Sequence, residues 1–253
     1  MNPKLQHWQG KRVWIIGAST GIGAATAAAL HALGAQVIVS ARKVPALEAF
    51  ALQHPTSTAL PLDVTDRAAV HTATQSLLAQ GPLDCVMYCA GHYNAMRATA
   101  MDVDDMQRHL AVNYSGALYV LEAIVPSMVS RKSGHISLVG SVAGYSGLPN
   151  SLAYGPTKAA LINLAETLYL DLHRLGVGVS IINPGFVETP LTANNAFDMP
   201  ALLTPAQAAQ HIVQGWAGGA FEIHFPKRFT LWLKLLRLLP YRLYFALVGK
   251  VTL

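Results

Sequence analysis

A tyrosine and a lysine stand four residues apart in the stretch AYGPTKAAL, where a long helix is expected to begin. Residues at this spacing are neighbours on a helix surface, so the Tyr154 phenol and the Lys158 ammonium lie together. A free tyrosine has a pKa near ~10, and a cation about 5 Å away lowers it by roughly two units. The pair therefore predicts a general acid, unless it is a chance surface pair.

A glycine-rich turn, IIGASTGIGAA, joins the first predicted strand to the first predicted helix. Gly17, Gly21 and Gly23 let the backbone approach a pyrophosphate, which then meets unpaired N–H groups and the positive end of the helix dipole. The turn therefore predicts a dinucleotide site. Arg42, with Ser40 nearby, ends the second predicted strand where an acid would select NAD, so the sequence favours NADP and its 2′-phosphate.

Strands and helices alternate along the chain. Five short, apolar, β-rich runs predict strands buried on both faces, at residues 12–18, 35–41, 83–91, 134–141 and 177–185. Helical stretches at 21–34 and 158–176 each close on a glycine. The expected fold is α/β, a single Rossmann-like doubly wound parallel sheet with helices on both faces, and its ligands bind beyond the carboxyl ends of the strands.

Composition and charge narrow the classes of function. No linker divides residues 1–226, which predicts one domain, followed by a tail at 227–253. The first 226 residues hold 12 bases and 13 acids, whereas the tail holds six bases and no acid, so we expect no nucleic-acid partner. The N-terminus lacks the apolar run of a secretory signal. Cys85 and Cys89, about 13 Å apart on a strand, form neither a disulfide nor a zinc site, and we expect no metal and a cytoplasmic location.

In order along the chain, the motifs GASTGIG, LDV, CAG, NYSG, GSVAGY, YGPTK and NPGFVET resemble those of the short-chain dehydrogenase/reductase family, from about Gly10 to Thr189. The resemblance implies a nicotinamide-dependent oxidoreductase acting on C=O or CH–OH groups. The catalytic residues that it implies are Asn113, Ser141, Tyr154 and Lys158. The cofactor-binding residues that it implies are Gly17, Ser19, Thr20, Gly21, Ile22, Gly23, Ser40, Arg42, Asp63, Val64, Ala90, Gly91, Tyr154, Lys158, Pro184, Gly185, Val187 and Thr189.

The resemblance also implies a role for each catalytic residue. Tyr154 donates a proton to the carbonyl oxygen, Ser141 hydrogen-bonds the same oxygen, Lys158 also holds the ribose, and Asn113 supports a water-mediated proton path. Cys89 stands where the family usually has an asparagine that braces the central strand, which places the local stability or the loop position in question.

The stretch after Thr189 predicts a lid at about 190–225, with a helix from about Pro205. Its apolar residues Leu191, Phe197, Met199, Leu202 and Leu203 favour a hydrophobic carbonyl or alcohol substrate, unless they only pack on the sheet. With the tail, they distantly resemble lipid- and steroid-handling reductases of the family, including the 3-ketosphinganine reductase type. Two alternatives stay open: a regulatory protein that binds NADP(H) without catalysis, and an NAD-dependent alcohol dehydrogenase. We expect a homo-dimer or tetramer.

The tail, FPKRFTLWLKLLRLLPYRLYFALVGKVTL, combines bases with Leu, Trp, Phe and Tyr. Its charges and Pro240 interrupt the apolar runs at intervals too short for a membrane span. Two interpretations remain. The apolar face either packs in a subunit interface or over the substrate pocket, or it lies flat on an anionic membrane with Trp232, Leu235, Leu236 and Leu239 inserted.

Overall fold

The computed structural model describes residues 1–193 and 199–249. Its centre is one seven-stranded, entirely parallel sheet with the order β3-β2-β1-β4-β5-β6-β7. The strands are β1 (Arg12–Ile16), β2 (Gln36–Ala41), β3 (Thr58–Pro61), β4 (Cys85–Tyr88), β5 (His135–Val139), β6 (Gly178–Pro184) and β7 (Glu222–Phe225). The predicted α/β doubly wound fold is confirmed.

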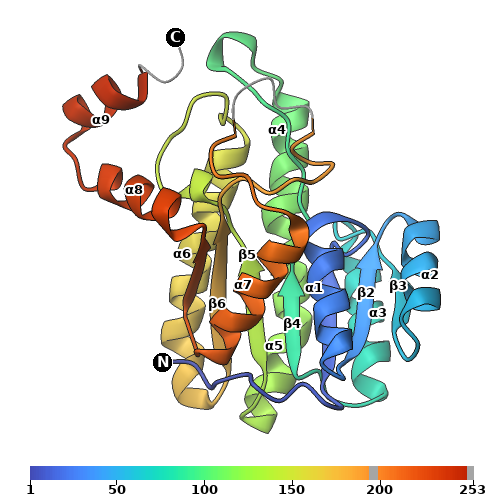
Figure 1. Cartoon of the computed structure of the whole chain (residues 1–253). Coiled ribbons are helices and arrows are strands. Elements are labelled where there is room, and N and C mark those ends of the chain that lie inside the picture. Colours follow the sequence, from blue (N-terminus) through green and yellow to red (C-terminus); the bar gives the residue numbers. More distant parts are fainter. Residues whose placement is uncertain (194–198, 250–253) are drawn as a thin grey trace.

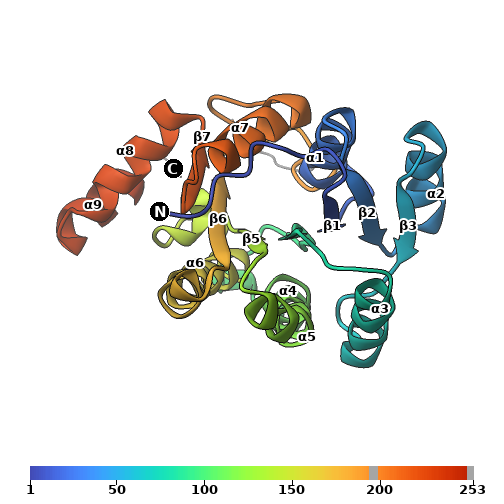
Figure 2. The same cartoon turned by 90° about the horizontal axis from the view of Figure 1, so that it is seen from below.

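Helices cover both faces of this sheet (Figures 1 and 2). One face carries α1 (Gly21–Ala32) and α7 (Pro205–Ala217), with α2 (Val44–Gln53) beside β3. The other carries α3 (Arg67–Ala79), α4 (Val103–Leu110), α5 (Gly116–Arg131) and α6 (Tyr154–Leu172). Beyond the β7 edge lie α8 (Lys227–Arg237) and α9 (Tyr241–Val248).

Successive side chains of a strand point to opposite faces of the sheet, so the sheet has a hydrophobic core on each face. In β1, Val13 and Ile15 point to the core under α1 and α7, whereas Trp14 and Ile16 point to the core under the other helices. All four side chains are fully buried. This two-sided burial is why the strand has no polar face.

Local signals fix several helix starts. The Asp66 carboxylate accepts the Ala69 N–H at 3.0 Å and caps α3. Thr204 and Gln207 form a capping box at α7, which begins at Pro205 as expected. The structure differs from the sequence prediction in two respects. Helix α6 begins at Tyr154, four residues before the stretch that was predicted to be helical. The edge strands β3 and β7 were not predicted.

Among the described residues, no helix is both long enough and apolar enough to cross a membrane. Within the predicted lid, residues 205–225 form α7, which packs against α1, and the edge strand β7. Phe197 lies outside the described residues.

Candidate active site

A cavity of about 170 Å³ opens at the carboxyl ends of the strands, near the point where the strand order reverses between β1 and β4. It collects eleven of the residues that were predicted to be catalytic or cofactor-binding. Those predicted residues are Thr20, Gly21, Ile22, Gly91, Ser141, Tyr154, Lys158, Pro184, Gly185, Val187 and Thr189. Cys89, Val139, Gly140, Leu191 and Thr192 complete the lining.

The glycine-rich turn is packed so tightly that larger residues do not fit. Gly17 has φ +92°, and a Cβ there would lie 2.4 Å from the Ala90 backbone nitrogen. A Cβ on Gly23 would lie 2.3 Å from the Gly17 carbonyl oxygen. Gly17, Gly23 and Ala90 therefore pack within the turn and do not line the cavity, whereas Gly21 does line it.

The same turn presents the N-terminus of α1 to the cavity. Thr20 is the N-cap residue, and its side chain makes no capping hydrogen bond to the first turn. Thr20, Gly21 and Ile22 all line the cavity. A helix start in this position fits an anionic pyrophosphate, which the dipole and the backbone N–H groups attract.

The second strand places Arg42 at the surface, but its neighbour Ser40 in the sheet interior. The Ser40 hydroxyl accepts the Trp14 indole N–H at 2.8 Å, and the residue is fully buried. The prediction that Ser40 contacts a 2′-phosphate is therefore wrong. Arg42 is exposed, and its charge is one of the influences on the nearby Asp63.

Two further residues that were predicted to bind the cofactor, Asp63 and Val64, differ in exposure. Asp63 is exposed and accepts hydrogen bonds from the Thr65 N–H and hydroxyl, at 3.0 and 2.8 Å. The Thr65 N–H bond is the largest influence on Asp63 and lowers its pKa. The Val64 side chain is buried against α5, where a Cβ on Gly116 would lie 3.0 Å from it. Ser19 does not line the cavity.

Tyr154, Ser141 and Lys158 meet in the cavity from two elements. Ser141 follows β5, and its hydroxyl hydrogen-bonds the Tyr154 phenol. Tyr154 and Lys158 share one face of α6, with the Lys158 Nζ 5.4 Å from the centre of the phenol ring. The Lys158 ammonium donates to the Val139 carbonyl oxygen at 2.8 Å. The predicted phenol, hydroxyl and ammonium groups therefore lie together in the cavity.

Burial shifts the pKa values of Tyr154 and Lys158. It raises the pKa of the Tyr154 phenol, and the Ser141 hydrogen bond only partly opposes that rise. Burial also lowers the pKa of Lys158 to about 8. The expected net lowering of the Tyr154 pKa is therefore not found in this structure, because desolvation of the phenolate outweighs the influences that favour it. A phenol that keeps its proton suits a proton donor.

Asn113 lies in a π-helical turn, Ala111–Ser115, between α4 and α5. Its side chain is fully buried and accepts the His92 N–H at 2.7 Å. It also donates to the His92 carbonyl oxygen and to the Thr157 hydroxyl, each at 3.0 Å. The side chain thus ties the loop after β4 to α6 rather than lining the cavity. Such π-helical turns occur often at functional sites.

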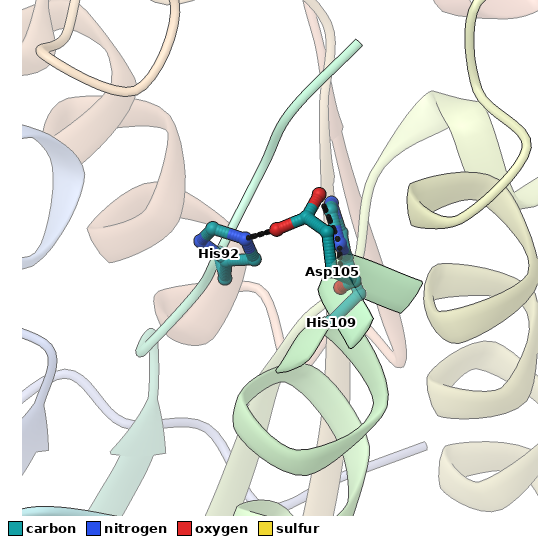
Figure 3. A group of neighbouring side chains, drawn as sticks. All are labelled: His92, Asp105 and His109. Atoms are coloured by element: carbon teal, nitrogen blue, oxygen red, sulfur yellow. Dashed lines mark hydrogen bonds and ion pairs between the residues drawn. The ribbon is translucent and has the colours of Figure 1, made fainter. Parts of the chain in front are cut away.

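A histidine–aspartate–histidine cluster, His92, Asp105 and His109, lies beside this contact (Figure 3). The His92 Nε2 and Asp105 Oδ1 are 2.7 Å apart. Burial opposes the charge of Asp105, but the His92 hydrogen bond and the charges of both histidines lower its pKa overall. The cluster was not predicted from the sequence, although His109 lies one helical turn before Asn113.

The ligand atoms of this cluster lie within 4.8 Å of one another, as a metal site requires. However, both ring nitrogens of His109 already bond the backbone. The Nδ1 is 2.8 Å from the Asp105 carbonyl oxygen and 3.4 Å from its Oδ2, and the Nε2 accepts the Asn94 N–H at 3.1 Å. A metal ion would have to break one of the two backbone bonds. We therefore interpret the cluster as a brace that fastens the loop after β4 to α4.

Cys89, the departure from the family pattern, keeps its place through the backbone. Its N–H donates to the Ile16 carbonyl oxygen at 2.7 Å, which continues the pairing of β4 with β1. Burial raises the pKa of its thiol to about 11, so the thiol stays neutral where it lines the cavity. Neither cysteine is in a disulfide.

Comparison with known proteins shows the family of the chain. The family model for short chain dehydrogenase matches residues 11–199, and the chain belongs to the short-chain dehydrogenase/reductase family. It is an oxidoreductase that uses a nicotinamide cofactor and acts on CH–OH or C=O groups of a small molecule.

Two relatives and one solved structure show how similar this chain is to known proteins. An uncharacterized oxidoreductase of Myxococcus xanthus is 34% identical over 237 residues, covering 92% of this chain and 94% of the relative. The 2-keto-3-deoxy-L-fuconate dehydrogenase of Xanthomonas campestris is 37% identical over 183 residues, covering 72% of this chain and 60% of that protein. A short-chain dehydrogenase from Streptomyces avermitilis is 25% identical with a TM-score of 0.84, covering 96% of this chain and 98% of that one.

Proposed function

We propose that this protein is an NADPH-dependent reductase that transfers hydride to the carbonyl of a hydrophobic, lipid- or steroid-like ketone or aldehyde, or catalyses the reverse alcohol oxidation. The observation that carries the proposal is the half-buried Tyr154 phenol, hydrogen-bonded to Ser141 inside a largely apolar cavity. The catalytic unit is residues 1–226, including the lid at about 190–225, and the tail is 227–253.

The roles of the residues follow from their positions. When bound, the nicotinamide supplies or accepts the hydride. Ser141 orients the substrate oxygen, and Tyr154 donates its proton to that oxygen as the alcohol forms. Lys158 places a positive charge beside the phenol, which stabilises the phenolate left after transfer. Asn113 holds the loop wall in place so that these groups keep their geometry.

The preference for an apolar substrate rests on the cavity lining. Ile22, Val139, Pro184, Val187 and Leu191 are among its lining residues, and more of the lining surface is apolar than polar. Among the described lining residues, Lys158 is the one charged side chain, and its ammonium is held by the Val139 carbonyl. A sugar acid, such as the substrate named for the Xanthomonas relative, would need a second cation for its carboxylate. Leu202, 43% exposed, extends the apolar surface of the lid.

The preference for NADPH rests on Arg42. An exposed guanidinium at the end of β2 can bind a 2′-phosphate through two N–H groups, and no acid occupies the strand end to accept a ribose hydroxyl. The protein should bind NADPH at least ten times more tightly than NADH, about 1.4 kcal/mol.

Arg42→Asp should erase or reverse this preference. Arg174→Asp, the same charge change at an exposed position after α6, should leave it intact. Fluorescence titration of both cofactors measures the ratio. Equal affinity of the unmodified protein for NADPH and NADH would contradict the proposal.

A regulatory NADP(H)-binding protein without catalysis is the second candidate, and it would bind cofactor without turnover. The enzyme is also proposed to be a cytoplasmic homo-dimer or tetramer. Exposed leucines on α4, α5 and α6, namely Leu110, Leu118 and Leu170, support an interface on that face, and light scattering measures the assembly. Contact of the tail with a membrane is also part of the proposal.

A further inference from the structure

The tail helices α8 and α9 each pack one face against the rest of the chain and expose the opposite face to solvent. On α8, Phe229 contacts the Phe186 ring at 5.6 Å between centroids, and the buried Thr230 hydroxyl bonds the His224 Nδ1 at 2.6 Å. Leu233 packs on the core, and Lys234 pairs with Glu222. On α9, the buried Tyr244 donates to the Gly147 carbonyl oxygen at 2.7 Å. These contacts fix the orientation of both helices.

The opposite face of α8 is apolar and exposed. Leu231, Trp232, Leu235 and Leu238 span an arc of about 120° at ~100° per residue, and they are 54%, 67%, 51% and 80% exposed. This set differs from the sequence prediction, since Leu236 and Leu239 are only half-exposed. A single exposed leucine is ordinary, but a contiguous patch of this kind indicates an interaction surface.

The surface continues onto α9. Exposed large apolar side chains there are Tyr241, Leu243, Phe245 and Leu247. In Figure 1, α8 and α9 stand away from the sheet at its β7 edge, and they lie toward the end of the molecule where the carboxyl ends of the strands hold the cavity. The two helices of 11 and 8 residues are too short to span a bilayer.

Charge indicates what covers this surface. Lys227 and Arg228 are exposed at the N-terminal end of this face, Arg237 and Arg242 are exposed elsewhere on the tail, and the tail holds no acid. A second copy of the tail would bring like charges together, which opposes self-association through this face. An anionic lipid surface satisfies both features, because headgroups attract the bases while the interface takes up the apolar side chains.

We propose that the apolar face of α8 and α9 docks on an anionic lipid bilayer. The proposal deepens the function proposed above, because it supplies the route by which a hydrophobic carbonyl compound reaches the cavity. Leu231, Trp232, Leu235 and Leu238 enter the interface, and Lys227 and Arg228 meet the headgroups.

Helix α8 also contacts residues in and beside the walls of the cavity. Phe229 lies against Gly185, a lining residue, since a Cβ there would be 3.0 Å from its ring. The Lys234 ammonium lies 5.7 Å from the centre of the Tyr145 ring, in the loop that follows Ser141. The tail is therefore continuous with the walls that receive the substrate, and it holds them near the lipid surface.

The test is co-sedimentation of the full chain with vesicles of phosphatidylcholine alone and of phosphatidylcholine mixed with phosphatidylglycerol, at low and physiological salt. Removal of the tail would expose the core beneath Phe229 and Leu233, so point variants are used. The intact protein should bind the mixed vesicles, and less so at higher salt. Lys227→Gln with Arg228→Gln should weaken binding by about 30-fold, because each base near the surface contributes ~1 kcal/mol.

Trp232→Ser with Leu235→Ser should abolish binding, whereas Leu52→Ser, at a leucine on α2 that is 85% exposed, should leave it unchanged. Activity on a water-soluble ketone, measured in the same variants, separates a failure of docking from a failure of the proposed function. The inference is overturned if the intact protein stays in the supernatant with mixed vesicles at low salt. It is also overturned if the Trp232/Leu235 variant binds like the intact protein, or if it only changes the oligomeric state.

Discussion

At the scale of single residues, the site depends on groups whose protonation burial has shifted. The Tyr154 phenol keeps its proton because the phenolate would be desolvated, and Lys158 carries its charge in the same dry surroundings. The buried charge of Lys158 costs folding free energy, and both groups serve proton transfer. Active sites commonly trade stability for activity in this way.

Lys158→Met should make the protein more stable at neutral pH while removing its activity. The folded pKa of about 8 lies below the ordinary value of 10.5, so the unfolded chain binds more protons between these values and stability rises with pH across that window. Below pH 8 the whole penalty persists, roughly 3 kcal/mol, and loss of the Val139 hydrogen bond offsets about 1.

Urea unfolding at pH 7 should therefore show a gain of about 2 kcal/mol for the methionine variant. At pH 10 the gain should shrink, since the folded lysine is then neutral and the unfolded lysine begins to lose its proton near its ordinary pKa of 10.5. Lys43→Met, at an exposed lysine, serves as the control and should show no gain at either pH. A destabilised Lys158→Met protein at pH 7 would count against this explanation.

At the scale of elements, the loop after β4 is held from two sides. Asn113 bonds both backbone polar groups of His92, and Asp105 on α4 bonds the His92 ring. Tyr93 follows in the same loop, with its ring centre 5.0 Å from that of Tyr154. The brace therefore determines where one wall stands relative to the acid.

Asp105→Asn should loosen this wall and leave cofactor binding unchanged. A neutral amide weakens a buried charge-assisted hydrogen bond by about 1–2 kcal/mol, which predicts a roughly 5- to 30-fold lower kcat/KM for the carbonyl substrate. Asp104→Asn, at the exposed neighbouring acid, is the matched control. Steady-state kinetics and NADPH titration measure the two effects. Parallel losses in cofactor affinity would instead indicate general unfolding of the loop.

At the scale of the whole molecule, both ends of the chain fasten the sheet. The buried Asn2 side chain donates to the Val179 carbonyl oxygen at 2.6 Å and accepts the Val179 N–H at 3.0 Å. Trp8 packs on Trp216 of α7, with ring centroids 5.5 Å apart. At the other end, α8 covers Phe186 and Glu222 beside the cavity. The N-terminal segment thus fastens the end of the sheet away from the cavity and α8 packs nearer to it, both in regions on which the family motifs give no information.

The sequence predicted the central strands, the parallel order and the cluster around Tyr154 because these depend on local apolar runs and ordered motifs. It missed β3 and β7, since four-residue, half-buried edge strands leave little pattern. Ser40 was misplaced because its partner, Trp14, lies on another strand. His92 and Asp105 are 13 residues apart and meet only in the folded chain. Burial, which sets the pKa of Tyr154, is likewise a tertiary property.

The central claim is that Tyr154 gives its proton to a hydrophobic carbonyl compound as NADPH is oxidised. The most direct measurement follows the nicotinamide absorbance with a series of ketones and aldehydes of rising apolar surface, for the unmodified protein, Tyr154→Phe and Tyr169→Phe. The unmodified protein should turn over, and most efficiently on the more apolar compounds. Tyr154→Phe should lose at least ~10²-fold in turnover while binding NADPH normally, and Tyr169→Phe, on the same helix, should match the unmodified protein. Full activity of Tyr154→Phe would contradict the account.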